Sequence, residues 1–222
     1  MDKAPNGWNL VKKIGKITEL GSGADSEVSR VSNHEKNVDL VIKEYGRLES
    51  GPNHPQNAEE ILKEYYSDTE KARKLTEKNP NPLNQSIRIG NEEIFLNYEI
   101  ESQGLLMLEN ESVNETPKKM SLGQRFIGGF NFSLLMERES AESKLVPDSQ
   151  QVFINNPRLC RELHKMVLEF FVHLQKTLSV HFIYNPMNVK PFFDEKEKRV
   201  RIVITDLASN LRSYYEHKLE KN

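Results

Sequence analysis

Two short groups of residues in the first half of the chain could bind a polyphosphate. Gly21 and Gly23 lie in the segment Gly21-Ser22-Gly23-Ala24-Asp25-Ser26-Glu27-Val28, between two expected strands. Glycines at such a turn let the backbone approach a phosphate and direct its amide groups toward it. Lys43 ends Val41-Ile42-Lys43 on the next alternating segment, where one inward ammonium group could neutralise phosphate charge.

Two groups in the second half could hold a divalent cation against those phosphates. Asn188 ends the segment His181-Phe182-Ile183-Tyr184-Asn185-Pro186-Met187-Asn188, and Asp206 directly follows the apolar run at 200–204 and Thr205. Both residues flank one expected hairpin, so an amide oxygen and a carboxylate oxygen could share the cation. The sequence therefore predicts Asn188 and Asp206 as metal ligands.

Each group also has an ordinary structural explanation. The glycine segment could be a simple hairpin turn, and Lys43 a solvated lysine at a sheet edge. Asn188 could be a turn amide, and Asp206 a helix cap. The four groups in this order are much less expected by chance than any one of them.

The first half of the chain is expected to supply strands around one helix. A helix over residues 57–78 begins at Asn57, a good N-cap, and Glu60 stands where a capping box would place it. Gly90 and Asn91 separate two short β-type runs, which predicts a hairpin. The expected strands are residues 14–20, 28–31, 38–44, 87–89, 94–98 and 104–108.

The second half is expected to be mostly helical. A helix over 121–139 contains Gly128 and Gly129, and a polar loop over 140–155 follows it. The strongest helix runs from Asn156, its cap, through Pro157 to Leu178 with a single apolar stripe. A hairpin over 189–193 and 200–204 follows, then a charged helical tail over 214–222. We expect residues 110–119 to connect the two halves.

Composition excludes some classes of function. Lys and Arg total 31 and Asp and Glu total 33, a net charge of −2. We therefore expect no nucleic-acid partner and no membrane partner, since no basic excess exists to neutralise phosphates. The single cysteine, Cys160, and the polar residues 1–9 predict a cytoplasmic protein, and delivery into another cell stays open.

The order of the four groups resembles the protein-kinase-like superfamily, and more narrowly small bacterial kinase-like proteins of the YrbL type. The resemblance extends over about residues 14–210, and its specific part is the four motifs. In the first half, the resemblance implies matches to the loop glycines and valine (Gly21, Gly23, Val28), with Ser26 at the position of the third glycine, and to the strand lysine (Lys43). In the second half, it implies matches to the catalytic-loop histidine, proline and asparagine (His181, Pro186, Asn188). It also implies that Asp206, followed by Leu207 and Ala208, matches the D-F-G aspartate.

Two positions depart from the family pattern or stay ambiguous. Glu60 and Glu64 lie one helical turn apart, and Glu64 is preferred as the partner of Lys43 because Glu60 already has a capping role. Ile183 stands at the position of the catalytic aspartate, where an isoleucine can neither orient a hydroxyl group nor accept its proton.

The resemblance implies a minimal two-lobed α+β kinase-like fold without an activation segment or the late helices of the second lobe. The expected lobes are residues 1–112, a twisted antiparallel sheet with one helix, and residues 113–222, a truncated helical lobe with the metal-binding hairpin. ATP and Mg²⁺ are the implied cofactors, with nucleotide contacts from Gly21, Ser22, Gly23, Ser26, Val28, Lys43, Glu64, Leu108 and Asn110, and with Lys43 and Asp206 as catalytic residues. The implied function is an atypical phosphotransferase. The alternative is a pseudokinase, a nucleotide-responsive regulatory module, and either would have a protein partner or substrate.

Overall fold

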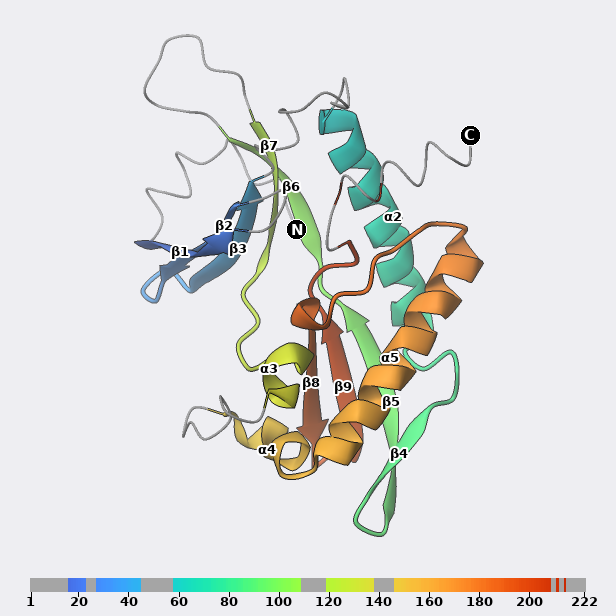
Figure 1. Ribbon diagram of the computed structural model, residues 1–222. Helices are drawn as coiled ribbons and strands as arrows, with labels where there is room; N and C mark the ends of the chain where they lie inside the picture. Colours follow the sequence, from blue (N-terminus) through green and yellow to red (C-terminus); the bar gives the residue numbers. More distant parts are fainter. Residues whose placement is uncertain are drawn as a thin grey trace, which may run out of the picture. The chain divides into compact units, whose positions relative to one another are not determined.

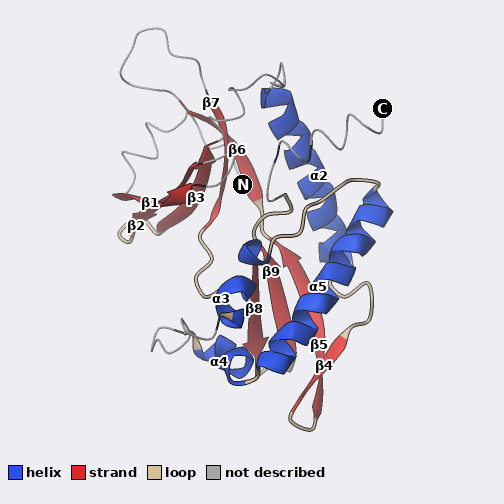
Figure 2. Ribbon diagram, in the orientation of Figure 1, coloured by secondary structure: helices blue, strands red, loops and turns tan. Residues whose placement is uncertain are grey.

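The chain forms an α+β fold, which confirms the predicted class (Figure 1). The computed structural model describes residues 16–22, 27–44, 58–108, 119–137, 146–208, 211 and 214. Within these residues the strands belong to two separate sheets, and helices accompany them (Figure 2).

The first sheet has five antiparallel strands in the order β1-β2-β3-β7-β6. The strands β1 to β3 form a meander, and β6 and β7 form a hairpin that joins it through β7. The central strand β3 is covered on both faces, because the consecutive residues Val41 and Ile42 point to opposite faces and are both buried. The bounds are β1 Lys16–Ser22, β2 Glu27–Asn33, β3 Val38–Glu44, β6 Gln103–Leu108 and β7 Lys119–Arg125.

Strand β7 corrects two expectations. The predicted helix over 121–139 is wrong in its first part, where β7 pairs with β3 on one side and with β6 on the other. Pairing on both edges overrides local helix preference, because it satisfies the backbone and buries Leu122 and Gln124. The segment between β6 and β7 therefore joins two strands of one sheet, and its expected role as the connector of two lobes stays a prediction.

The second sheet has four strands in the order β4-β5-β9-β8. β4 and β5 form the predicted hairpin at Gly90, as β8 and β9 do around Asp194–Arg199, and the parallel pair β5–β9 joins the two hairpins. The hairpin β4–β5 was expected beside the first sheet, so this placement corrects that expectation. The bounds are β4 Ser86–Ile89, β5 Glu92–Ile100, β8 Val189–Asp194 and β9 Arg199–Ile204.

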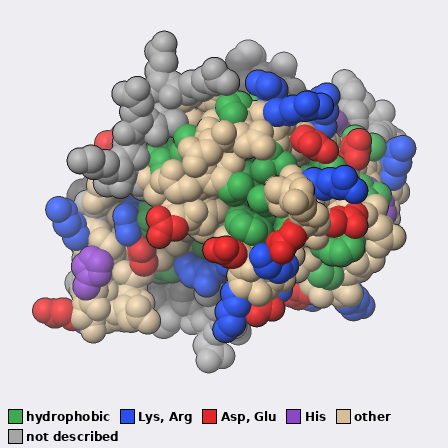
Figure 3. All heavy atoms as spheres, turned by 90° about the horizontal axis from the view of Figure 1, so that it is seen from below, with side chains coloured by type: hydrophobic (Ala, Val, Ile, Leu, Met, Phe, Trp, Pro, Cys, Tyr) green, Lys and Arg blue, Asp and Glu red, His purple; other side chains and the backbone are tan. Residues whose placement is uncertain are grey.

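One face of the second sheet is apolar, and the other carries both apolar side chains and an ion pair. Ile94, Leu96 and Tyr98 alternate as buried residues along β5, and the Tyr98 ring stacks on Phe170 of helix α5 with centroids 3.9 Å apart. On the other face, Arg201 donates two hydrogen bonds of 2.7 Å to the carboxylate of Glu99. Acidic and basic side chains are similarly interspersed on the face of the molecule in Figure 3.

Helix α5 (Pro157–Leu178) confirms the strongest sequence prediction. The Asn156 side chain accepts a hydrogen bond from the Leu159 amide, and Pro157 occupies the first turn. Helix α3 (Phe132–Met136) is the helical part of the predicted 121–139 segment. Helix α4 (Asp148–Asn155) occupies a stretch expected to be loop, where Gln150 and Phe153 are buried.

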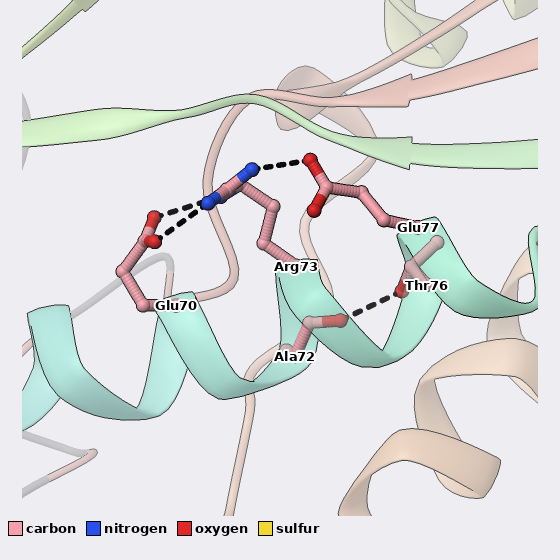
Figure 4. A network of polar contacts seen from close by, with 5 residues as sticks. All are labelled: Glu70, Ala72, Arg73, Thr76 and Glu77. Atoms are coloured by element: carbon pink, nitrogen blue, oxygen red, sulfur yellow. Dashed lines mark hydrogen bonds and ion pairs between the residues drawn. The ribbon is translucent and has the colours of Figure 1, made fainter. Parts of the chain in front are cut away.

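Helix α2 (Ala58–Lys78) also agrees with its prediction, although its predicted cap, Asn57, lies outside the described residues. Salt bridges at helical spacing reinforce its second half (Figure 4). Arg73 donates to both carboxylate oxygens of Glu70 at 2.9 Å, and also to Glu77. Thr76 donates from Oγ1 to the Ala72 carbonyl at 2.8 Å.

The chain divides into two compact units whose segments alternate along the sequence. Helix α2 contributes its first half to one unit and its second half to the other. The predicted boundary at residue 112 lies outside the described residues and stays a prediction. Unit 1 takes its described residues from Met1–Ser67, Ser102–Phe126 and Asn210–Leu219, and unit 2 from Asp68–Glu101 and Ile127–Ser209.

Candidate functional site

In unit 1, one row of paired residues crosses the first sheet through Lys43. Gly21 of β1 pairs with Val28 of β2, Val28 pairs with Lys43 of β3, and Lys43 pairs with Leu122 of β7. Directly opposed residues on antiparallel strands share one face of the sheet. The register therefore places Val28, Lys43 and Leu122 on one face, with the backbone of Gly21 at the end of the row.

Lys43 is unusually buried for a lysine, with 9% of the residue exposed. Val41, two residues earlier, shares its face and is also buried, whereas Ile42 is buried on the opposite face. The alternative of a solvated edge lysine is wrong, because β3 is a central strand with partners on both sides. A buried ammonium group is costly unless something compensates its charge.

Glu64 lies beside the buried face of helix α2. Ile61, Leu62 and Tyr65 are buried in the first half of this helix. At about 100° per residue, Glu64 lies about 60° from Ile61, while Glu60 lies farther from the buried stripe. The Glu64 side chain is exposed, and its pairing with Lys43 stays a prediction.

In unit 2, the residues that resemble a catalytic loop follow helix α5 directly. The helix ends at Leu178, and Ser179 adopts a left-handed conformation that turns the chain out of it. Ile183 then forms a parallel bridge with Ala208, and its amide donates to the Leu207 carbonyl at 2.9 Å. The loop and the segment after β9 are therefore held together by main-chain hydrogen bonding.

A second set of contacts brings Asn188 close to the residue before Asp206. The 3₁₀ helix η3 (Pro186–Asn188) is capped by the Asn185 side chain, which accepts from the Met187 amide at 2.9 Å. The Asn188 carbonyl accepts from both the amide and the hydroxyl of Thr205. The two predicted metal ligands therefore flank the end of the β8–β9 hairpin that lies opposite its turn.

Asp206 is held in a turn of its own. It is 6% exposed, and Oδ1 accepts a hydrogen bond of 3.1 Å from the Ala208 amide. This is an Asx-type turn, in which the carboxylate accepts from the backbone amide two residues later. A carboxylate that is fixed by its own backbone suits Mg²⁺, which prefers hard oxygen ligands and keeps several waters. The two residues fit the cation in donor chemistry.

Ile183 brings no carboxylate to this loop. It is half-buried and aliphatic, so it offers no proton acceptor. The neighbouring Tyr184 ring lies 5.2 Å from the His164 ring of α5, and burial raises the pKa of Tyr184 and lowers the pKa of His164. Both side chains are therefore uncharged near neutral pH and act as packing for the loop.

Sequence reasoning missed the residues that anchor the segment after β7. Gln150 is fully buried and donates to the Phe130 and Pro191 carbonyls, both at 2.8 Å, while accepting from the Phe130 amide at 2.8 Å. Lys190 donates to the Ile127 carbonyl, and burial lowers the pKa of Lys190. Gln150 lies in the polar run Asp148–Gln151, so composition gave no signal of its burial.

Several predicted nucleotide contacts are described only in part. Ser22 is the last residue of β1 and Leu108 the last residue of β6. Gly23, Ser26 and Asn110 lie outside the described residues. Among the residues that the structure does describe, no group of three or more His, Cys, Asp or Glu side chains could hold a metal ion, and no helix is long and apolar enough to cross a membrane.

No protein-family model and no curated protein matches the chain. Solved structures do match it, among them the crystal structure of Rad53 1-466 in complex with AMP-PNP, at a TM-score of 0.43 and 14% sequence identity. The match covers 90% of this chain and 40% of that chain, so this chain spans less than half the length of the matched protein kinase. The functional assignment therefore depends on this chain's own residues.

Proposed function

We propose that this protein binds ATP together with Mg²⁺ and acts as an atypical kinase-like phosphotransferase. The observation that carries the proposal is the burial of Lys43 in a cross-strand row with Gly21 and Val28, on a central strand. A glycine backbone, a valine and a buried lysine on one sheet face supply the contacts that a nucleotide triphosphate needs. Asn188 and Asp206 of unit 2, which flank one end of the β8–β9 hairpin, support the same ligand.

Each residue has a separate task in this proposal. Lys43 binds the α- and β-phosphates, and the backbone around Gly21 binds the outer phosphates. Asn188 and Asp206 would hold Mg²⁺, which neutralises charge on the phosphates when bound. Glu64 pairs with Lys43 and directs its ammonium group.

The missing aspartate at position 183 sets the expected rate. Phosphoryl transfer depends mainly on positioning and on electrostatic stabilisation, which the lysine and the metal supply. Loss of a general base costs roughly 10²- to 10⁴-fold. We therefore expect slow transfer to a protein substrate.

The same isoleucine favours a second candidate function. A pseudokinase would bind the nucleotide through Lys43 and Asp206 without transferring phosphate, and would regulate a protein partner instead. Label transfer from γ-labelled ATP, with the protein alone and with a cell lysate, distinguishes the two. Transfer that disappears in Lys43→Met supports the phosphotransferase, and binding without transfer supports the pseudokinase.

Thermal unfolding with and without ATP and Mg²⁺ tests binding itself. A ligand at 100 times its Kd stabilises by about 2.7 kcal/mol, so the wild type should melt at a higher temperature with both present. Lys43→Met, which keeps the unbranched stem, and Asp206→Asn should lose this shift. The controls Lys16→Ala, exposed on β1, and Asp148→Asn, exposed on α4, should keep it. Equal shifts in all five proteins would contradict the proposal.

A further inference from the structure

We propose that Tyr214 is a positioning residue that holds helix α2 so that Glu64 faces Lys43. This inference rests on the proposed function, in which Glu64 directs the lysine. Tyr214 lies in the segment after Asp206, and its ring packs edge-on against Tyr65 of α2, with centroids 5.6 Å apart and planes at 75°. The two residues are 2% and 0% exposed, so both rings are part of the core of unit 1.

Tyr65 and Glu64 are neighbours on the helix, so the Tyr65–Tyr214 contact affects the direction of Glu64. Tyr65 is the next residue after Glu64, and neighbouring residues of a helix point about 100° apart. Any rotation of α2 about its axis that moves the Tyr65 ring therefore turns Glu64 by the same angle. A close-packed ring at Tyr65 leaves little room for such a rotation. The Tyr65–Tyr214 contact thus fixes the direction of Glu64.

Leu211 is a second buried residue in the same part of the chain as Tyr214. Leu211 is 1% exposed and, like Tyr214, is helical and belongs to unit 1. Leu211 and Tyr214 are therefore both part of the core of unit 1. Ala208, just upstream, still belongs to unit 2.

A double-mutant cycle separates positioning from simple core packing. The dissociation constant of ATP with Mg²⁺ is measured by calorimetry for the wild type, Tyr214→Ala, Glu64→Gln and the double variant. Tyr214→Ala should weaken binding roughly tenfold, the scale of coupling between sites. In the Glu64→Gln background, the same change should add no further loss. Tyr214→Phe, which keeps the ring, should bind like the wild type.

Two controls keep the test decisive. Tyr66→Ala, a half-buried neighbour on α2, should lower the melting temperature without changing nucleotide affinity. If Tyr214→Ala does not fold, Tyr214→Leu, which keeps the bulk but loses the ring edge, replaces it. Unchanged affinity in the single variant, or an equal loss with and without Glu64, would overturn the inference.

Hydrogen exchange distinguishes failure of this inference from failure of the proposed function. Tyr214→Ala should speed the exchange of α2 amides at residues 61–66, while residues 70–76 in unit 2 keep wild-type rates. If the wild type binds no nucleotide, both the proposed function and the role of Glu64 are overturned, whatever the exchange rates are. If the wild type binds ATP but exchange at 61–66 is unchanged, only the role of Tyr214 is overturned.

Discussion

The Asn188 carbonyl accepts two hydrogen bonds from Thr205, one from the amide at 2.8 Å and one from Oγ1 at 3.1 Å. This double contact joins the two chain segments at the end of the β8–β9 hairpin opposite its turn. The residue after Thr205 is Asp206. The side chain of Thr205 therefore acts as a backbone clamp between the two predicted metal ligands, although it is not itself a ligand in the proposal.

Thr205→Val should loosen this end of the hairpin. The substitution keeps the amide bond and the β-branched shape but removes the hydroxyl bond, which costs about 1 kcal/mol of unfolding free energy. Urea unfolding measures the loss, and ATP affinity should fall with it. Thr177→Val is the matched control, because Thr177 makes a similar hydroxyl-to-carbonyl bond of 2.9 Å on the exposed end of α5. A control loss as large as that of Thr205→Val would contradict this account.

Gly129→Ala should destabilise the segment that leads into unit 2. Gly129 has φ +84°, and an added Cβ would lie 2.9 Å from both Gln150 Oε1 and Phe192 Cε1. Gln150 cannot move away without breaking its three hydrogen bonds, so the expected cost is about 2 to 4 kcal/mol. Chemical unfolding measures it.

The control for this substitution is Gly90→Ala. Gly90 also has a positive φ, +63°, but no atom lies within 4 Å of its added Cβ. Only the backbone conformation opposes this change, at about 1 to 2 kcal/mol. Equal losses at the two positions would show that contact with Gln150 and Phe192 contributes nothing.

Stability should fall on mild acidification because of His164. Burial lowers the pKa of His164 below the ordinary value of 6.5, and its ring lies between Phe132 and Tyr184. Between the lowered pKa and 6.5, the unfolded chain binds more protons than the folded chain, so the unfolding free energy decreases as the pH falls through this window. Urea unfolding at pH 7.5 and 5.5 checks the direction.

His164→Phe should remove that part of the pH dependence while keeping an aromatic ring in the stack. His34→Gln, in the exposed turn after β2, should retain the wild-type pH dependence. A pH dependence that is identical in the wild type and His164→Phe would assign the acid sensitivity to other groups.

Ile183→Asp should raise phosphate transfer. The Ile183 amide bond to Leu207 does not involve the side chain, so the loop geometry can persist with a carboxylate at this position. A correctly placed base adds roughly 10²-fold or more to the rate. Single-turnover transfer from labelled ATP measures it, with Ile183→Asn as the control of similar shape and no base. If both variants bind ATP and neither gains activity, the pseudokinase is favoured.

Local signals in the sequence predicted the elements whose first and last residues are marked by caps or turns. Helix α5 follows from Asn156, Pro157 and its apolar stripe, and the β8–β9 hairpin from two apolar runs around a charged turn. The order of the strands could not be read in this way. β7 is a strand because β3 and β6 flank it, and β5 pairs with the distant β9.

In the candidate site, too, local signals identified some residues, whereas the roles of others depend on distant partners. The sequence singled out Lys43, Asn188 and Asp206 by type and order, and the structure adds that Lys43 is buried and that Asn188 and Asp206 adjoin one hairpin end. Gln150 and Tyr214 could not be found in advance. Their roles come from partners far along the chain, Pro191 and Tyr65, which no local pattern connects to them.

The parallel pair β5–β9 has a consequence for biosynthesis. Phe95 pairs with Arg199, so the β4–β5 hairpin emerges from the ribosome long before the strand that completes its sheet. Until then, the edge of β5 that pairs with β9 is open, which is a hazard for premature association. Nascent chains stalled before residue 199 should therefore bind chaperones through this hairpin, and chains extended past residue 204 should release them.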